Sequence, residues 1–317
     1  MKRTGYIILC EHAKSAGKFT RLLIPNEKMR YPAGMSPNTL STSNPAGEIN
    51  TLEVLRKTDD GFVLGGRDQR EIFMPKASAP DDCEPGRSLH VFIYPENDGE
   101  LVATCNIPKA QVGECALMTA VTVTRAGAFM DWGIEKDLLV PVSQQLTPMS
   151  EGESYVVYVL MDPDQRIIGS SKLHRFLDER AKNMAPGEQV DLLIVGKTDL
   201  GYKAVVNGTH LGLLYKGEVF QDLKPGDKTS GYIKAVRPDR KIDLSLQRQN
   251  KQTRDQLTDQ ILAFLKTNGG SSILTDYSPP EAIYKQYKVS KKNYKKALGA
   301  LYKQRLISLT RDKVTLL

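Results

Sequence analysis

Nine glycines fall at matching positions in three consecutive stretches of this 317-residue chain, and this repeat constrains the fold more than any other feature. In each copy a glycine is followed 14 residues later by a second glycine, and 25 residues after that by a third. The triplets are Gly47, Gly61 and Gly86; Gly113, Gly127 and Gly152; and Gly187, Gly201 and Gly226. Each third glycine precedes a β-rich stretch that ends in Thr104, Ser170 or Ser245. Such tandem self-similarity indicates three copies of one structural unit.

The middle copy shows what the unit contains. Residues 127–141 (GAFMDWGIEKDLLVP) read as a strand, a turn and a second strand, and their alternation places Ala128, Met130 and Trp132 on one face. That face belongs in a core, whereas Phe129 faces the other way, where an aromatic ring can stack on a base. Five short strands in about 60 residues, with glycines where strands bend or pair closely, predict a small Greek-key barrel of the oligonucleotide-binding (OB) type.

The C-terminal segment changes from period two to helical spacing. A helical stripe that begins at Leu257 stops at Gly269-Gly270, Pro279-Pro280 opens a second helix, and Ser290 is placed to cap a third. A hairpin over residues 306–317 follows, and three helices with a two-stranded wing are typical of a winged-helix domain. The inward side of the third helix is expected to hold Tyr294, Leu298, Leu301 and Tyr302. Its outer side carries Lys291, Lys292, Lys295, Lys296 and Lys303.

The expected fold class is therefore mainly β, with three tandem five-stranded OB barrels followed by an α+β winged-helix domain. In order, the parts are a flexible basic extension (1–46), barrel 1 (47–108), barrel 2 (109–171), a helical connector (172–186), barrel 3 (187–249) and the winged helix (250–317).

The charge is distributed unevenly along the chain. The net charge is +7, yet residues 48–186 sum to −8 and residues 251–317 to +8. A basic end on an acidic body suggests a polyanionic partner that contacts mainly the C-terminal end. The lysines of the third helix have no acidic partner one turn away, which favours an anionic ligand over a merely solvated surface.

Several functional classes lack support in the sequence. The four cysteines form no CxxC pair, the four histidines lie far apart, and no phosphate-binding or dinucleotide-binding glycine motif is present. We therefore expect no metal, no cofactor and no catalysis. No apolar run near the start is long enough for a membrane span, so a cytoplasmic protein is expected. The oligomeric state is left open.

The repeats resemble the RNA-binding barrel named after the largest small-subunit ribosomal protein (the S1 type). Three such barrels followed by a winged helix resemble the bacterial conserved virulence factor B family, also called the CvfB or YitL group. The resemblance covers about residues 47–317. It is most specific over residues 127–141, together with the preceding residues 111–114 (QVGE) and the following Lys172.

The resemblance implies an RNA-contact surface on each barrel, and the copies keep it to different degrees. The first copy has Asp60, Val63 and Pro75 at the leading contact positions, so barrel 1 is expected to be structural or to contact proteins. The middle copy keeps Phe129 and Arg166, together with Asp162, but it has Ala126 and Pro141 where the family has an aromatic residue and a histidine. The third copy substitutes other groups that can bind RNA: Lys203, Tyr215, Arg237 and Lys241.

Three functional hypotheses follow. The first is a non-catalytic RNA-binding protein that stacks bases of single-stranded RNA, such as mRNA, on Tyr215 and Phe129. Lys203, Arg237, Lys241 and Arg166 would line the strand's path, and Lys291, Lys292, Lys295 and Lys296 would contact phosphates. The resemblance implies that it would regulate gene expression after transcription, with ribosome or protein partners on barrels 1 and 2. The alternatives are a DNA-binding transcriptional regulator that uses the winged helix, and a pure scaffold.

Overall fold

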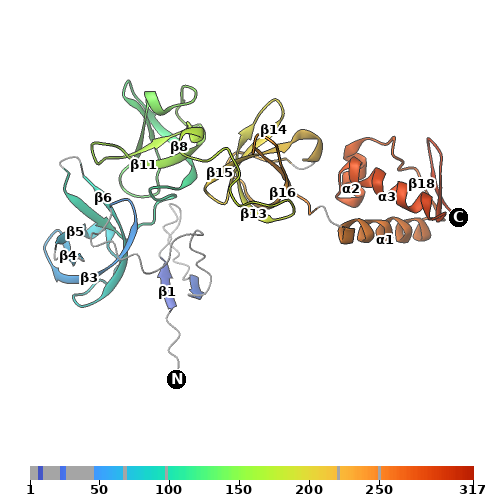
Figure 1. The fold of residues 1–317 in the computed structure, drawn as a ribbon. Coiled ribbons are helices and arrows are strands. Elements are labelled where there is room, and N and C mark those ends of the chain that lie inside the picture. Colours follow the sequence, from blue (N-terminus) through green and yellow to red (C-terminus); the bar gives the residue numbers. More distant parts are fainter. Residues whose placement is uncertain are drawn as a thin grey trace. The chain divides into compact units, whose positions relative to one another are not determined.

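The structure of the chain is a computed structural model that describes residues 6–9, 22–25, 46–66, 70–96, 99–219, 222–248 and 251–317. The chain divides into two compact units, residues 1–176 and 177–317. Figure 1 shows barrels 1 and 2 in the first unit, and barrel 3 and the helical domain in the second. Within the expected N-terminal extension, β1 (Tyr6–Leu9) pairs antiparallel with β2 (Leu22–Pro25). The remainder of residues 1–45 lies outside the described residues, and its flexibility stays a prediction.

Three five-stranded β units confirm the expected mainly-β fold. Barrel 1 contains β3 (Ile49–Lys57), β4 (Gly61–Gly65), β5 (Glu71–Pro75), β6 (Ser88–Pro95) and β7 (Leu101–Thr104). Barrel 2 contains β8 (Cys115–Val123), β9 (Gly127–Met130), β10 (Leu138–Pro141), β11 (Ser154–Met161) and β12 (Ile167–Ser170). Barrel 3 contains β13 (Gln189–Lys197), β14 (Gly201–Val206), β15 (His210–Tyr215), β16 (Lys228–Val236) and β17 (Ile242–Ser245).

Barrels 1 and 3 are closed by a parallel pair of strands. β5 pairs with β7 in barrel 1, and β15 pairs with β17 in barrel 3. Barrel 2 is a five-stranded sheet in the order β10-β9-β8-β11-β12. Its two edge strands meet through side chains, because a Cβ atom at Gly169 on β12 would lie 2.8 Å from Val140 Cγ2 on β10. Closure of the sheet removes exposed strand edges, so barrels of this kind can stand in tandem without pairing edge to edge.

A physical requirement explains why glycine occurs at each of the three repeated positions. The first and third glycines adopt positive φ values of 79–94°, where residues with a side chain are strained. The second glycine allows two strands to approach closely. A Cβ atom at Gly127 would lie 2.2 Å from the Val140 carbonyl oxygen, and one at Gly201 would lie 1.9 Å from that of Leu214. The small polar residue that ends each unit is buried, and its hydroxyl accepts a hydrogen bond from the backbone two residues later, as Ser170 does from Lys172.

One hydrophobic cluster joins barrels 1 and 2, whereas a separate cluster fills the interior of barrel 1. Trp132, which follows β9, is 2% exposed, and its ring packs edge-on against Phe92 of β6, with centroids 5.2 Å apart. Phe92, Tyr94 and Val102 of barrel 1 belong to the same buried cluster as Met118, Met130 and Val140 of barrel 2. The indole Nε1 donates to the Ala110 carbonyl at 2.7 Å. The expectation that Trp132 lies in a core is therefore confirmed, and this core joins two barrels.

Polar contacts from residues 131–137, the β9–β10 loop, fix the same junction. Glu135 Oε1 accepts from Ser78 Oγ at 3.0 Å and from Asn106 Nδ2 at 2.6 Å. Lys136 Nζ donates to the Pro95 carbonyl at 2.8 Å. Each of these contacts crosses from barrel 2 to barrel 1 or to the segment between them. Within the stretch that the sequence singled out, the loop between β9 and β10 therefore joins the two barrels.

The connector at 172–186 differs from the expected helix. It contains one 3₁₀ turn, Leu173–Arg175, followed by irregular turns and bends with a single β-bridge at Asp178. Phe176 of the connector stacks on Tyr158 of barrel 2 with ring centroids 4.8 Å apart. Asp178 instead forms backbone hydrogen bonds on both sides of His210, an edge pairing that a helix would preclude. Tertiary hydrogen bonds thus override the local helical pattern.

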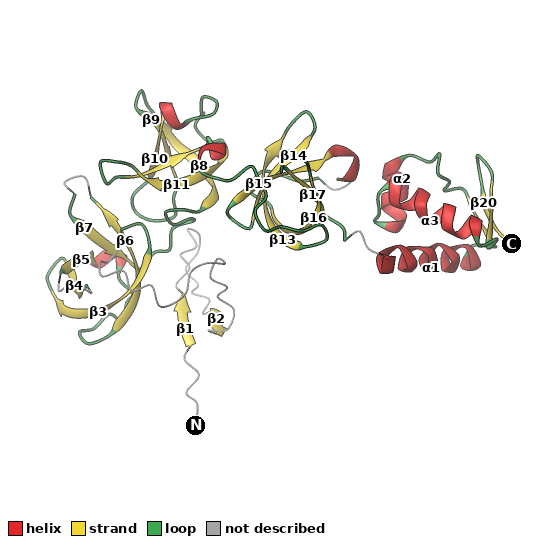
Figure 2. Ribbon diagram, in the orientation of Figure 1, coloured by secondary structure: helices red, strands yellow, loops and turns green. Residues whose placement is uncertain are grey.

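The C-terminal domain is a winged helix, as expected. It comprises α1 (Lys251–Thr267), β18 (Ser271–Ser272), α2 (Pro280–Tyr287), α3 (Lys291–Lys303), β19 (Ile307–Leu309) and β20 (Val314–Leu316). Figure 2 shows its helices beside the small sheet, whose strand order is β18-β20-β19. Ser290 caps α3, since its Oγ accepts from the Asn293 N–H at 3.2 Å. Tyr294, Leu298 and Leu301 are buried, but Tyr302 is 56% exposed, so its predicted inward position is wrong.

Candidate nucleic-acid interface

Tyr215 stands at the end of β15, directly across the ladder from Gly201. The glycine lets β14 approach this end of β15 closely, since any side chain would collide with the Leu214 carbonyl. Tyr215 is half-buried, whereas the preceding Leu214 is fully buried in the barrel core. The close pairing of β14 and β15 therefore fixes the backbone of Tyr215, while its ring remains partly open to solvent.

Two cations lie over the Tyr215 ring. Lys234 Nζ is 5.7 Å from the ring centroid, and Arg237 Cζ is 6.0 Å from it. Arg237 is held in place because its Nε donates to Asp243 Oδ1 at 2.7 Å, and this hydrogen bond raises the pKa of Arg237 above its ordinary value. An aromatic ring with fixed positive charges beside it can stack a base and attract the adjoining phosphates. Tyr215 and Arg237 were predicted from the sequence, and the structure brings them together.

Lys234 is a member of this group that the sequence reasoning missed. β16 contains a bulge, because Ile233 pairs with Leu244 and Ala235 pairs with Asp243, which leaves Lys234 as the extra residue. A bulge changes the direction in which side chains point. The regular alternation of side chains along β16 therefore does not predict that Lys234 lies over Tyr215. The sequence offered one weaker signal, which is that Lys234 stands three residues before Arg237.

The other two predicted cations of barrel 3 do not share the Tyr215 cluster. Lys203 lies on β14, and its Nζ is 3.8 Å from Glu179 Oε1 of the connector. Lys241 is exposed in the β16–β17 turn, where its backbone N–H donates to Asp239 Oδ1 at 3.1 Å. Both positions stay predicted contacts with nucleic acid.

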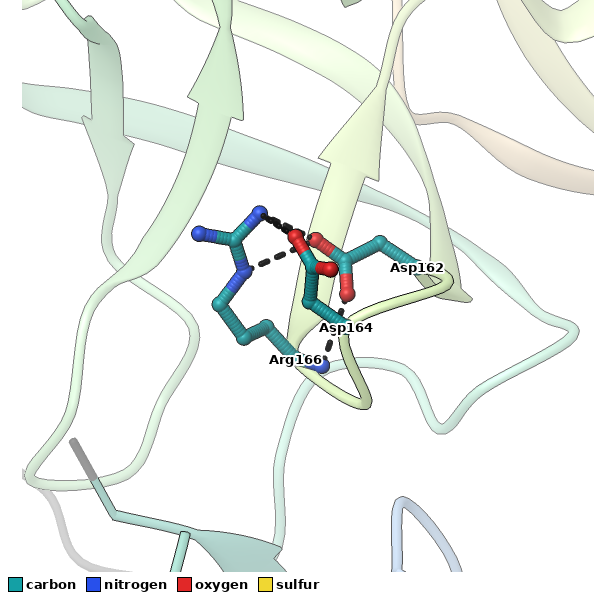
Figure 3. Close-up of polar contacts among 3 residues, drawn as sticks. All are labelled: Asp162, Asp164 and Arg166. Carbon is teal, nitrogen blue, oxygen red and sulfur yellow. Dashed lines mark hydrogen bonds and ion pairs between the residues drawn. The ribbon is translucent and has the colours of Figure 1, made fainter. Parts of the chain in front are cut away.

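In barrel 2, Arg166 is engaged by two carboxylates. Figure 3 shows its guanidinium beside Asp162 and Asp164, with Nη2 2.7 Å from Asp162 Oδ2 and 2.9 Å from Asp164 Oδ2. Asp162 also accepts from the Arg166 backbone N–H at 2.8 Å, so the pair closes the β11–β12 turn. A phosphate at Arg166 would have to compete with both acids. Phe129, on β9, is half-buried, and the structure records no contact between it and Arg166 among the described residues.

The Asp162 carboxylate gives a prediction for acid stability. Burial opposes its ionisation, but the hydrogen bonds and charge of Arg166 outweigh that effect and hold the pKa of Asp162 below its ordinary value. The stabilisation is therefore present above an unfolded-state pKa of about 4 and is lost as the pH falls through the lower folded-state value. Asp162→Asn should lower the unfolding midpoint in urea at pH 7, and the gap to the wild type should narrow below about pH 4. Asp164→Asn, at a side chain that is 73% exposed, is the control and should change little.

The lysines of α3 form two groups. Lys291 Nζ donates to the Tyr277 carbonyl at 3.3 Å, and Lys295 Nζ lies 3.4 Å from Asp276 Oδ2, so both contact the loop before α2. Lys292, Lys296 and Lys303 are exposed, and no ion pair is recorded for them in the described part of the chain. The acidic partner of Lys295 comes from a loop rather than from the next helical turn, which is why the helix sequence alone did not show it.

Barrel 2 carries a shallow apolar groove of about 250 Å³ that the sequence did not indicate. It lies between the end of β8 and the segment after β10, beside Val123, Val142 and Leu146. Val142 is 58% and Leu146 63% exposed. Among the described residues, no group of three His, Cys, Asp or Glu side chains could hold a metal ion, and no helix there is long and apolar enough to cross a membrane.

Comparison with known proteins shows which families two of these domains resemble. Residues 46–106 match the family model for the S1 domain, and residues 259–316 match that for the CvfB-like winged helix domain. A protein named conserved virulence factor B from Staphylococcus saprophyticus is 24% identical over 85% of this chain and 94% of its own length. The resemblance to the CvfB family is confirmed. A protein named YitL from Bacillus subtilis is likewise 24% identical to this chain, over 84% of it and 92% of YitL.

A solved structure of a multidomain protein with nucleic acid binding domains from Streptococcus pneumoniae also resembles this chain. It is 20% identical, covers 86% of this chain and 98% of its own, and has a TM-score of 0.37. An S1 domain together with a CvfB-like winged helix suggests nucleic acid binding, and neither matched model describes an enzyme. The S1 model matches barrel 1, the copy that keeps almost none of the contact groups. The match therefore identifies the barrel fold but does not indicate which barrel carries the binding surface.

Proposed function

We propose that this protein is a non-catalytic, cytoplasmic RNA-binding protein that holds single-stranded RNA, such as mRNA, on barrel 3 and on the basic face of α3. The observation that carries the proposal is the Tyr215 ring, which is half-open to solvent and flanked by Lys234 and Arg237. A base would stack on the ring, and the two cations would neutralise the phosphates on either side of it. Tandem barrels of the S1 type and the family resemblance support a role after transcription, in mRNA handling or translation.

A second candidate function is a DNA-binding regulator that acts through the winged helix, with barrels 1 and 2 contacting proteins or the ribosome. Lys292, Lys296 and Lys303 favour it, because the third helix of winged-helix domains commonly meets duplex DNA. The apolar groove on barrel 2 supports protein contact by that part of the chain.

One titration separates these functions. Binding of single-stranded RNA, single-stranded DNA and duplex DNA is measured by fluorescence anisotropy at several salt concentrations, with the full chain and with a chain that ends at residue 250. The winged helix has a buried core distinct from that of barrel 3, so its removal leaves the barrel core intact. We expect a preference for single-stranded RNA that survives truncation.

The salt dependence supplies a second readout of the same titration. The logarithm of the affinity should fall with the logarithm of the salt concentration, with a slope of about −0.7 per phosphate contacted on a single strand. Truncation should make this slope shallower, because the α3 lysines are removed. A preference for duplex DNA that disappears on truncation would instead establish the DNA-binding function, and no binding at low salt would leave a scaffold.

A further inference from the structure

The loop between β18 and α2, residues 273–279, exposes two large side chains. Ile273 is 83% exposed and Tyr277 is 67% exposed. The loop also contacts the tip of the β19–β20 wing, because the Thr275 hydroxyl donates to the Arg311 carbonyl at 3.0 Å. Neither Ile273 nor Tyr277 contributes to the core of the winged-helix domain. Both side chains are therefore available for contact with a partner.

Hydrogen bonds hold this loop in one conformation. Within the loop, the Thr275 N–H donates to Ser278 Oγ at 2.9 Å, and the Tyr277 N–H donates to Thr275 Oγ1 at 3.2 Å. From α3, the Tyr294 hydroxyl donates to the Leu274 carbonyl at 2.8 Å, in addition to the bond from Lys291 Nζ to the Tyr277 carbonyl. Thr275 is only 2% exposed. The backbone that carries Tyr277 is therefore anchored to both the wing and α3, so little ordering entropy would be lost when its ring is used for binding.

A cation accompanies the exposed ring. The Arg311 guanidinium carbon lies 6.0 Å from the centroid of Tyr277, and Lys291 contacts the Tyr277 backbone. This arrangement repeats on the winged helix what barrel 3 shows at Tyr215, an aromatic ring with cations beside it. An exposed ring offers little to a duplex, whose bases are covered by their stacked neighbours, but it can stack on an unpaired base.

We propose that Tyr277, with Arg311, forms a second stacking site on the winged-helix domain, and that it takes an unpaired base of a single-stranded nucleic acid. The proposal rests on the proposed function and sharpens it, because it assigns the winged helix to single strands rather than to duplex DNA. Lys292 and Lys296 on α3 are the cations available for the phosphates of the same strand.

The test uses the full chain and a short single-stranded oligonucleotide that contains 2-aminopurine, made both as RNA and as DNA. Stacking on an aromatic ring quenches the fluorescence of this base, so affinity and stacking are read together. Tyr277→Ala should weaken binding at least about fivefold and remove part of the quenching, whereas Tyr277→Phe should retain both. Tyr302→Ala removes an exposed tyrosine of the same domain as a matched control and should bind like the wild type.

The variants distinguish this site from the one on barrel 3. If Tyr215→Ala weakens binding but Tyr277→Ala does not, the loop site is overturned and the proposed function stands. If the wild-type chain fails to bind single strands at low salt, both are overturned. Equal weakening of single-strand and duplex binding by Tyr277→Ala, with quenching unchanged, would show that the residue acts on the backbone of the nucleic acid and would also overturn the stacking site. Equal losses with the RNA and DNA oligonucleotides are expected, because the stacking chemistry is shared.

Discussion

Replacing Tyr215 with alanine is expected to weaken the binding of single-stranded RNA about tenfold or more. Stacking of one base on an aromatic side chain contributes roughly 1–3 kcal/mol, and this ring also positions the cations Lys234 and Arg237. Because Tyr215 is half-buried at a strand end, the substitution should leave the core of barrel 3 in place. Anisotropy titrations with an unstructured RNA, at one fixed salt concentration, measure the change.

Two control variants isolate the contribution of the ring. Tyr215→Phe keeps the stacking surface and should bind within about twofold of the wild type, since a hydroxyl adds little to a stack. Leu146→Ala removes an apolar side chain that is 63% exposed on barrel 2, away from Tyr215 in the sequence repeat, and should have no effect. An affinity of Tyr215→Ala equal to that of the wild type would remove barrel 3 from the binding surface.

Trp132→Ala is expected to cost roughly 3–5 kcal/mol of stability in the first unit, the range for a fully buried aromatic residue. The substitution removes the edge-on contact with Phe92 and the hydrogen bond to the Ala110 carbonyl, and it opens the core that barrels 1 and 2 share. Urea unfolding followed by circular dichroism measures the loss. Labelling of the buried thiol of Cys83, read by peptide mass spectrometry, reports whether barrel 1 loosens together with barrel 2.

The comparison for this prediction is Phe129→Ala. Phe129 is on the same β9 strand but faces the opposite way and is half-buried, so its removal should cost clearly less. A double-mutant cycle between Trp132 and Phe92 should give a coupling of about 0.5–1.5 kcal/mol, as expected for an aromatic pair. Because Cys83 lies in the separate core of barrel 1, labelling that becomes faster only after barrel 2 has fully unfolded would show that barrel 1 does not depend on the Trp132 cluster.

The barrels could be predicted from the sequence because the backbone conformation or the strand packing at each repeated position requires a glycine. A positive φ or a strand approach that excludes a Cβ atom permits almost no other residue, so such positions can be read without knowledge of the tertiary structure. The third helix was predicted for a similar reason, since Ser290 supplies a local capping bond that depends only on neighbouring residues.

What escaped prediction depends on contacts between distant segments. The connector at 172–186 was expected to be helical, but Asp178 pairs with His210 and Phe176 stacks on Tyr158, and these contacts hold it in an irregular conformation. Lys234 reaches Tyr215 because of a bulge, which has no simple sequence signature. Tyr277 lies in a loop without periodicity, so only the fold shows that Arg311 accompanies it.

The hydrophobic cluster that joins barrels 1 and 2 also affects the order in which the two barrels fold during synthesis. A chain grows from its N-terminus, so all five strands of barrel 1 are synthesised before residues 131–137. Until then Phe92 and Tyr94 lack the partner that covers them. Barrel 1 has a closed sheet and a core of its own, but one of its faces is covered only when the second barrel has been made. A pause in translation between the two barrels would leave that apolar face open to chaperones or to another nascent chain.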